Sequence, residues 1–582
     1  MATMVRPRAR ALAAFHMQMT HPHSLELASE RWLLPFSFRT VPLYRFDVLV
    51  IGGGAAGSCA ALAAARAGAQ VALVAKAELL ESNTVAAQGG MAAVLAPEDS
   101  FESHAADTLR LGCGLAHGEV VRQVVDGGPA AVERLVGLGA EFDRESGGTF
   151  ALSREGGHSA PRIIHAQGAA TGQEIQRALT AGLEEAEAVT SFPTTFVLDL
   201  LPAEDGIQGA LCRTDRGDLV AFVAPEVILA TGGSGQIYRE TTNPPIATGD
   251  GVAAAVRAGA RVRDLEFVQF HPTCLYIAGA ARFLISEVVR GAGGVLRDRH
   301  GVRFMPDFHA DGELAPRDVV SRAVFRRMVD TEDTSVYLDL SELDRDPRRL
   351  FPQIARTCRY FGIDIARDPI PVRPGAHYQI GGVTVDSDGR SSSPGLWAVG
   401  ECASSGLHGA NRMGSNSLLE ALVFGERAGR LAAQAGSRPD LGFLRTAPPR
   451  VVERPPAGLK INISDITYSL KSLMWRELGV ERSGAGLSDA GEHLGFWSRA
   501  VEGLAPAEIP AWELQNMLLL ARLATFSALA REETRGVHYR TDHGEEQADW
   551  RVHTELTPHI SGEHLDGVEL TRSAVEAGSS CQ

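Results

Sequence analysis

Phe46-Asp47-Val48-Leu49-Val50-Ile51 runs directly into Gly52-x-Gly54-x-x-Gly57, and this stretch decides the fold. The apolar run predicts a buried parallel strand, and the Ala-rich residues up to Ala67 predict a helix. Gln70-Val71-Ala72-Leu73-Val74 predicts a second strand, which completes a βαβ unit of about thirty residues. In that context the glycines let the backbone approach a pyrophosphate, whose charge the helix N-terminus stabilises. A plain tight turn is the alternative, but the βαβ context favours a dinucleotide site.

The end of the second strand bears on which nucleotide is bound. An NAD site places an acidic residue near this point to hold the ribose. Here the strand ends Val74-Ala75-Lys76. The missing carboxylate argues against NAD and leaves Lys76 near the nucleotide.

Two later strands indicate how the domain is assembled. Residues 227–233 predict another buried strand that enters a glycine turn, like the strand at 46–51. Residues 396–401 predict a further strand, far downstream of the one at 46–51. We therefore predict an α/β fold whose Rossmann-like domain is built from two chain segments. Pro448, Pro455 and Pro456 punctuate a linker, and helical periodicity follows it.

The expected domains are an N-terminal extension, expected to be disordered, at 1–44, the nucleotide-binding domain at 45–264 and 375–447, an inserted α+β capping domain at 265–374, a helical C-terminal domain at 455–545, and a tail at 546–582.

Bulk properties exclude several classes of function. The formal net charge of -15 disfavours nucleic-acid binding, because phosphate contact needs a basic face. The seven cysteines are dispersed without a Cys-x-x-Cys pair, which favours reduced thiols in a cytoplasmic protein and argues against an iron–sulfur or zinc site. We expect no metal. Residues 48–65 are uncharged, but their glycines break the run into strand, turn and helix, so we expect no membrane segment.

Five short motifs further along the chain carry side chains suited to holding an anion. Together they supply two His and three Arg, which suits a small dianion such as a dicarboxylate. The motifs are Phe270-His271-Pro272-Thr273, Ser286-Glu287-Val288-Val289-Arg290-Gly291, Ala315-Pro316-Arg317-Asp318, His377-Tyr378-Gln379-Ile380-Gly381-Gly382 and Gly409-Ala410-Asn411-Arg412-Met413.

The order and spacing of these motifs resemble the flavoprotein family of succinate dehydrogenases, fumarate reductases and L-aspartate oxidases, over nearly the whole chain. The resemblance implies FAD as cofactor. Respiratory members carry a His that bonds covalently to FAD just before a Thr-Val-Ala-Ala-Gln-Gly-Gly segment, where this chain has Asn83. Asn cannot form that bond, so we expect noncovalent FAD. The residues expected to bind it are Gly52, Gly53, Gly54, Ala55, Ala56, Gly57, Lys76, Asn83, Thr84, Val85, Ala86, Ala87, Gln88, Gly89, Gly90, Asp250, Glu401, Ser417 and Leu418.

One loop separates the subgroups of this family. Ser153-Arg154-Glu155-Gly156-Gly157-His158-Ser159 resembles the aspartate oxidase signature. Glu155 matches the position where those members place a carboxylate facing the substrate's ammonium, and such a carboxylate would repel succinate, which has no amino group. A solvated loop Glu is the alternative. The resemblance thus implies oxidation of L-aspartate to iminoaspartate by hydride transfer to FAD.

The resemblance also implies individual roles in the site. The substrate-binding residues would be Glu155, Gln269, His271, Ser286, His377 and Arg412. Glu287, Arg290 and Arg317 match the family's catalytic proton path. Because a guanidinium is essentially never deprotonated, Arg317 as a base and Arg317 as an electrostatic anchor both stay open. The Arg-rich segment 531–540 is expected to pack the C-terminal helices against the flavin domain.

In the family, oxygen or fumarate reoxidises the flavin, and iminoaspartate passes to quinolinate synthase, so transient contact with that enzyme and a place in NAD biosynthesis are implied. A soluble fumarate reductase or succinate-oxidising flavoprotein is an alternative reading, against which Glu155 and Asn83 count. A catalytically silent flavin-binding scaffold is another, and retention of Glu287, Arg290 and Arg317 argues against it.

Overall fold

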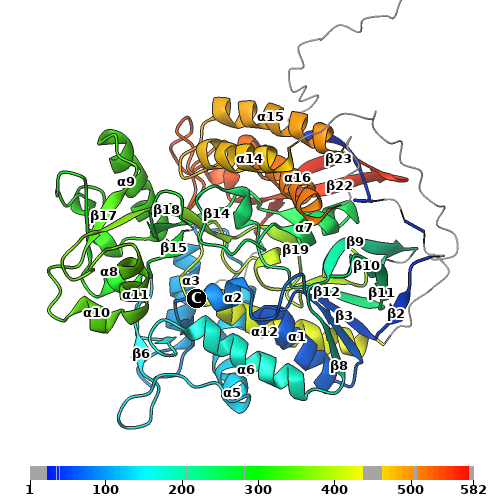
Figure 1. The fold of residues 1–582 in the computed structure, drawn as a ribbon, viewed down its shortest axis with the longest axis horizontal. Helices are drawn as coiled ribbons and strands as arrows, with labels where there is room; N and C mark the ends of the chain where they lie inside the picture. Colours follow the sequence, from blue (N-terminus) through cyan, green and yellow to red (C-terminus); the bar gives the residue numbers. More distant parts are fainter. Residues whose placement is uncertain are drawn as a thin grey trace, which may run out of the picture.

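The computed structural model describes residues 23–34, 36–37, 40–204, 206–280, 282–436, 462–502 and 508–575 (Figure 1). The linker expected around Pro448 and Pro455 lies outside the described residues, and so does most of the expected N-terminal extension.

A five-stranded parallel sheet forms the centre of the nucleotide-binding domain. Apart from the edge strand β8, its strands are almost wholly apolar and buried, as expected where helices cover both faces of a parallel sheet. The order is β20 (Leu396–Ala398), β12 (Glu226–Leu229), β3 (Val48–Ile51), β4 (Val71–Val74) and β8 (Val189–Phe192). Because β20 comes from far along the chain, the prediction of a Rossmann-like domain built from two segments is confirmed.

Two helices from opposite ends of this domain pack closely together. They are α1 (Ala55–Arg66) and α12 (Asn416–Ala435). A Cβ on Gly425 would lie 2.6 Å from the Ala56 carbonyl oxygen, and one on Gly429 would lie 2.2 Å from that of Ala60. Glycine at both positions lets the second chain segment lie against the first.

Smaller elements complete this domain. A four-stranded sheet has the order β2 (Leu43–Arg45), β11 (Leu219–Val223), β10 (Gly206–Arg213) and β9 (Phe196–Ala203). A three-stranded sheet has the order β5 (Met91–Ala92), β7 (Ile163–Ile164) and β6 (Leu152–Ser153). The helices are α2 (Asn83–Ala86), α3 (Phe101–Leu111), α4 (Gly118–Asp126), α5 (Gly128–Gly137), α6 (Thr171–Glu185) and α7 (Asp250–Arg257).

The inserted capping domain, drawn in green in Figure 1, has its own apolar core. Its antiparallel sheet has the order β15 (Phe283–Leu284), β14 (Val268–Leu275), β18 (Ile370–Gln379), β17 (Val336–Asp339) and β16 (Val295–Arg297). Its helices are α8 (Val288–Gly291), α9 (Arg317–Asp330), α10 (Pro347–Leu350) and α11 (Pro352–Tyr360). Strand β18 runs across the boundary that we expected at residue 375.

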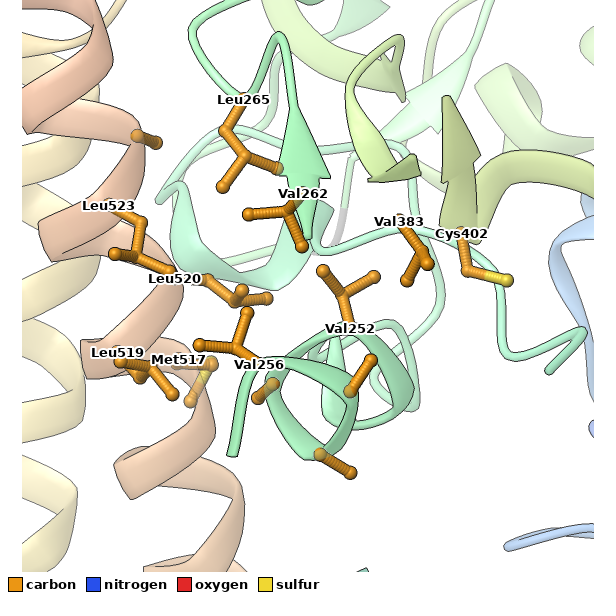
Figure 2. Close-up of a cluster of buried hydrophobic side chains, with 14 of the residues drawn as sticks. Val252, Val256, Val262, Leu265, Val383, Cys402, Met517, Leu519, Leu520 and Leu523 are labelled. Atoms are coloured by element: carbon orange, nitrogen blue, oxygen red, sulfur yellow. The ribbon is translucent and has the colours of Figure 1, made fainter. Parts of the chain in front are cut away.

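In the described part of the chain, the C-terminal helical domain contains α14 (Ile463–Glu477), α15 (Gly484–Glu502) and α16 (Ile509–Ala530). Figure 2 shows Met517, Leu519, Leu520 and Leu523 of α16 facing α7 in one apolar cluster. In the described residues, no helix is both long and apolar enough to cross a bilayer.

The segment that follows α16 ties the helical domain to the nucleotide-binding domain, where Arg535 donates to the carbonyl oxygen of Cys113 at 2.8 Å. The Nε of Arg531 donates to Glu266 at 2.7 Å, and both side chains are fully buried. The guanidinium of Arg540 donates to the carbonyl oxygens of Ala528 and Arg531 at 3.0 and 3.1 Å. These bonds satisfy carbonyl groups that the end of the helix leaves unpaired.

Both expected chain ends contain structure that the sequence analysis did not predict. Their strands belong to a six-stranded sheet of order β1 (Ser24–Glu30), β23 (His564–Ala574), β22 (Val552–Ser561), β13 (Val262–Arg263), β19 (Gly382–Thr384) and β21 (Ala403–Ser404). The interpretations of 1–44 as a disordered extension and of 546–582 as a tail are therefore wrong for residues 24–30 and 552–574, and the end of the expected extension also enters β2 of the four-stranded sheet. The strand β23 was not predictable locally, because its partner β1 lies far away in the sequence.

Candidate functional site

One long cavity lies between the nucleotide-binding domain and the capping domain. The glycine turn after β3 lines one end, and His271, Arg317 and His377 line the other. The carboxyl ends of β3, β12 and β20 meet at this cavity, which is where ligands bind to open parallel sheets.

The glycine turn brings backbone rather than side chains to the cavity. Gly52 has φ +114°, a left-handed conformation that side chains disfavour, and a Cβ there would lie 2.1 Å from the carbonyl oxygen of Ala230. Helix α1 begins at Ala55 with Gly54 as its N-cap, and the hydroxyl of Thr84 accepts a hydrogen bond from the backbone N–H of Ala55 at 3.0 Å. The turn leaves room and a positive helix terminus for a phosphate.

Two charged groups face the cavity near the turn. The Nζ of Lys76 lies 2.7 Å from the carboxylates of both Asp250 and Glu513, and Asn516 donates to the other oxygen of Asp250 at 2.7 Å. Lys76 and Asp250 line the cavity, whereas Glu513 and Asn516 come from α16 behind them. The C-terminal helical domain therefore fixes the charges at this end of the site.

Glu401 follows β20 and faces the same cavity. It accepts hydrogen bonds from the backbone N–H of Gln379 at 3.0 Å and from Asn83 at 3.1 Å. Burial raises the pKa of Glu401 to about 7, against the opposing effect of those donors. A group so placed can donate to, or accept from, a ligand hydroxyl.

Several polar atoms in the cavity wall have no hydrogen-bond partner among the described residues. They are Gln88 Oε1, Thr231 Oγ1 and Asn243 Oδ1, all buried. Buried polar atoms are normally paired, so these await a ligand with its own polar groups. Together with the glycine cradle and the helix terminus, they fit FAD, which carries a pyrophosphate, hydroxyls and a polar ring.

Most residues that the sequence analysis assigned to FAD line the cavity. Gly57 and Val85 do not: a Cβ on Gly57 would lie 1.9 Å from the Gly52 carbonyl oxygen, so this glycine serves close helix–strand packing. The assigned residues in the lining are Gly52, Gly53, Gly54, Ala55, Ala56, Lys76, Asn83, Thr84, Ala86, Ala87, Gln88, Gly89, Gly90, Asp250, Glu401, Ser417 and Leu418.

At the far end, two histidines from neighbouring strands lie with ring centroids 5.2 Å apart. The Nδ1 of His271 accepts from the backbone N–H of Thr273 at 3.3 Å, so the ring proton resides on Nε2. Burial and then the Arg317 charge hold the pKa of His271 well below its ordinary value, and burial and then Arg412 do so for His377. Both rings are therefore neutral near pH 7, and His271 can donate to an anion through Nε2.

Arg412 lies beside these rings. Its Nε donates to Gln269 at 3.2 Å, one Nη donates to Ser417 at 2.7 Å, and its guanidinium stacks on Tyr378 at 4.7 Å. Burial and the nearby Arg317 lower its pKa to about 10, which still leaves it charged at neutral pH. A fixed, charged fork of this kind suits a carboxylate.

Arg317 begins α9 and is held from two sides. Its Nε donates to Glu287 at 2.7 Å and one Nη donates to Gln269 at 3.3 Å. Burial opposes ionisation of Glu287, but Arg317 and Arg290 outweigh it and keep the pKa of that carboxyl below its ordinary value. Arg290 lies behind Glu287 at 3.6 Å, and burial lowers its pKa.

Glu155 lines the cavity near these cations, and no ion pair joins it directly to another described residue. It is only 7% exposed and accepts a hydrogen bond from Ser415 at 2.7 Å. The alternative of a solvated loop Glu does not fit this burial. A buried carboxylate without a counter-ion is costly, so the site favours a ligand with a positive group.

The structure places two predicted residues behind the cavity wall. Gln269 is fully buried, and its Oε1 accepts from both Arg317 and Arg412, so it fixes the arginines rather than lining the cavity. Arg290 is also absent from the lining. Glu155, His271, Ser286, Glu287, Arg317, His377 and Arg412 do line the cavity.

The sequence analysis missed several lining residues. Thr242 contacts Nδ1 of His377 at 2.9 Å, and Asn243 donates to the carbonyl oxygen of His377 at 3.0 Å. Tyr378 and Ser415 also line the cavity. Tyr378 stood inside a quoted motif, so its position was a usable signal, whereas Thr242 and Asn243 lie in a loop without a recognisable pattern.

This fold and this cavity define an FAD-binding flavoprotein with a capping domain over its substrate end. The FAD binding domain model matches residues 47–418, and the fumarate reductase flavoprotein C-terminal model matches residues 467–577. The chain is 43% identical to the L-aspartate oxidase of Streptomyces coelicolor, over 87% of this chain and 90% of that protein. It is 40% identical to the chloroplastic L-aspartate oxidase of Arabidopsis thaliana, over 88% and 83%.

Among solved structures, a quinol fumarate reductase chain of E. coli superposes with a TM-score of 0.85 at 31% identity, covering 93% of this chain and 98% of that one. The chain belongs to the L-aspartate oxidase family of FAD-dependent flavoproteins.

Proposed function

We propose that this chain is an L-aspartate oxidase that converts L-aspartate to iminoaspartate with noncovalently bound FAD. The observation that carries the proposal is the buried Glu155, which lacks an ion-pair partner among the described residues and shares one cavity end with Arg317, Arg412, His271 and His377. A substrate with two carboxylates and one ammonium pairs with all of these groups. The family membership supports the same assignment.

The residues of the chain hold and orient this substrate. His271 donates from Nε2 to one carboxylate, and Arg412 binds a carboxylate with parallel hydrogen bonds. Ser286 supplies a hydroxyl to the same region of the wall. Glu155 pairs with the ammonium and thereby fixes which face of the α-carbon is presented. Bound FAD would accept the hydride from that carbon.

A row of ion-paired side chains leads away from the cavity, in the order Arg317, Glu287 and Arg290. The Nε of Arg317 donates to Glu287, an arrangement that suits an electrostatic anchor for the substrate. Glu287 then lies between two guanidiniums and passes a proton to or from the site. The same three residues argue against a silent scaffold.

Further parts of the proposal concern the surroundings of the reaction. Oxygen or fumarate reoxidises the flavin, and the unstable imine passes to quinolinate synthase, the next enzyme of NAD biosynthesis. The reaction takes place in the cytoplasm, where thiols stay reduced, and all six cysteines among the described residues are free. A soluble fumarate reductase is the second candidate, which the superposition on quinol fumarate reductase favours.

Anaerobic flavin reduction separates the two candidates. The purified holoprotein is mixed with L-aspartate or with succinate at equal concentration, and the flavin absorbance is followed. We expect bleaching by L-aspartate and little or none by succinate, with the aspartate reaction strongly slowed in E155Q. Bleaching by succinate alone would assign the chain to the dicarboxylate-oxidising members and refute the proposal.

A further inference from the structure

Ser415 occupies an unusual backbone position at the wall of the cavity. It is the N-cap of α12 and has φ +64° and ψ -4°, the left-handed conformation, although it is not glycine. Such a residue costs free energy and persists only where its surroundings fix it. Here the carbonyl oxygen of Ser415 accepts from the backbone N–H of Ala92 at 3.1 Å. The backbone at Ser415 is therefore held in place by β5.

The hydroxyl of Ser415 is not used as serine is normally used at this position. An N-cap serine usually accepts a hydrogen bond from an N–H of the first helical turn. Ser415 makes no such bond, and its hydroxyl instead donates to Oε2 of Glu155 at 2.7 Å. The bond joins two segments that are 260 residues apart in the sequence.

The two oxygens of Glu155 have different surroundings. Oε2 is held by Ser415, whereas Oε1 faces Gly89, where an added Cβ would lie 3.6 Å from it. Glu155, Gly89 and Ser415 all line the cavity, and Gly89 belongs to the segment assigned to FAD. Ser415 thus fixes Oε2 of Glu155, whereas Oε1 can contact a ligand next to the segment that contains Gly89.

From this geometry we propose that Ser415 is the positioning residue that determines selectivity for an amino-bearing dicarboxylate. It fixes the Glu155 carboxylate so that the substrate's ammonium meets an oriented oxygen. The inference rests on the proposed function, because it assigns Ser415 to the recognition of the group that distinguishes aspartate from succinate. Ser415 acts through Glu155, so its loss weakens aspartate recognition without affecting groups that bind the two carboxylates.

The test compares kcat/KM for L-aspartate with the inhibition constant of succinate, a dianion that lacks the amino group. S415A removes the hydroxyl, and we expect kcat/KM for aspartate to fall about tenfold, chiefly through KM, as for loss of a hydrogen bond to a charged group. We expect succinate binding to stay nearly constant. S415G removes the same hydroxyl but accepts the left-handed backbone, so it separates hydroxyl loss from misfolding. S498A, a buried serine of α15, is the matched control.

A double-mutant cycle with E155Q identifies the partner through which Ser415 acts. We expect S415A to have little further effect on aspartate in the E155Q background. An equal effect in both backgrounds, or equal weakening of aspartate and succinate, would overturn the inference. Failure of the proposed function gives a different result, because wild-type flavin would then not be reduced by aspartate at all.

Discussion

Gly414 lies between Arg317 and Glu155, two side chains of opposite charge that line the cavity. A Cβ at this position would lie 2.8 Å from a terminal nitrogen of Arg317 and 3.1 Å from Oε2 of Glu155. Neither neighbour can yield freely, since Arg317 is held by Glu287 and Glu155 by Ser415. The absence of a side chain at Gly414 thus sets the spacing between the anchor for a carboxylate and the anchor for an ammonium.

We predict that G414A lowers kcat/KM for L-aspartate by about a hundredfold, because a displacement of about 1 Å in a positioned site costs that much. FAD binding should change little, since Gly414 is not among the residues that line the cavity. Steady-state kinetics and a flavin titration measure the two effects. G495A on α15, where the added Cβ meets only the end of Arg499, is the control. Unchanged kinetics in G414A would show that the spacing is not limiting.

The role of an individual residue could be predicted from the sequence only where that residue lies in a recognisable motif. The neutral state of His271 depends on the Thr273 backbone and on burial, neither of which a motif reveals. Gln269 and Arg290 were expected to bind substrate or move its proton, yet they support other side chains from behind the wall. Ser415 gave no signal, because its role depends on a backbone angle.

Helix α16 contributes to the cofactor end of the cavity although none of its residues lines it. Glu513 and Asn516 lie one turn apart and hold Lys76 and Asp250, which do line the cavity. Arg257 in turn donates to Asn516 at 2.6 Å. Helix α16, which the sequence analysis assigned to a separate helical domain, is thus hydrogen-bonded to charged side chains that we expect to bind FAD.

We predict that E513Q raises the Kd of FAD about tenfold, because Lys76 loses a charged hydrogen-bond partner and no longer holds one geometry. Quenching of flavin fluorescence during titration of the apoprotein measures this Kd without reference to activity. E508A changes an exposed Glu at the start of the same helix and should leave the Kd unchanged. An unaltered Kd in E513Q would mean that α16 has no part in cofactor binding.

Elements with strong local patterns were predictable, and elements that depend on distant partners were not. Residues 46–67 show the apolar pattern of a strand and a helix, with glycines at the turn between them. The strand β3 and the helix α1 therefore lie where expected. The strands β22 and β23 present polar residues on one face, and the pairing of β23 with β1 cannot be read from either segment alone. Local reasoning therefore assigned them to a tail.

At the scale of the molecule, several buried histidines lie outside the cavity. Burial lowers the pKa values of His104, His117 and His158 to about 4. An unfolded histidine titrates near 6.5. The folded pKa values lie below the unfolded one, so the stabilising contribution is fully present above pH 6.5 and is lost as the pH falls toward 4.

We predict that these three histidines together lower the free energy of unfolding by about 4 kcal/mol per pH unit between pH 6 and 5, because each binds a proton on unfolding. Chemical denaturation at a series of pH values measures the slope. H104Q should lower the slope by about 1.4 kcal/mol per pH unit, whereas H564Q, at an exposed position, should not change it. A flat profile above pH 5 would show that these histidines are already protonated in the folded protein.

The domain built from two chain segments was predictable at this scale. Buried apolar strands that are far apart in the sequence must pair with other strands, so we expected them to join one sheet. The joining of both chain ends in the six-stranded sheet was not. Strand β1 pairs along β23, and the backbone N–H of Leu570 bonds to the carbonyl oxygen of His23. No length or composition argument points to that closure.

That pairing has a consequence for how the chain is made. Strand β1 leaves the ribosome long before its partner β23, because the two lie far apart in the sequence. At a synthesis rate of about 5–20 residues per second, β1 waits roughly half a minute to two minutes with its pairing edge open. An open strand edge invites pairing with other chains. A nascent chain that terminates before β23 never closes this sheet, so products truncated there should aggregate.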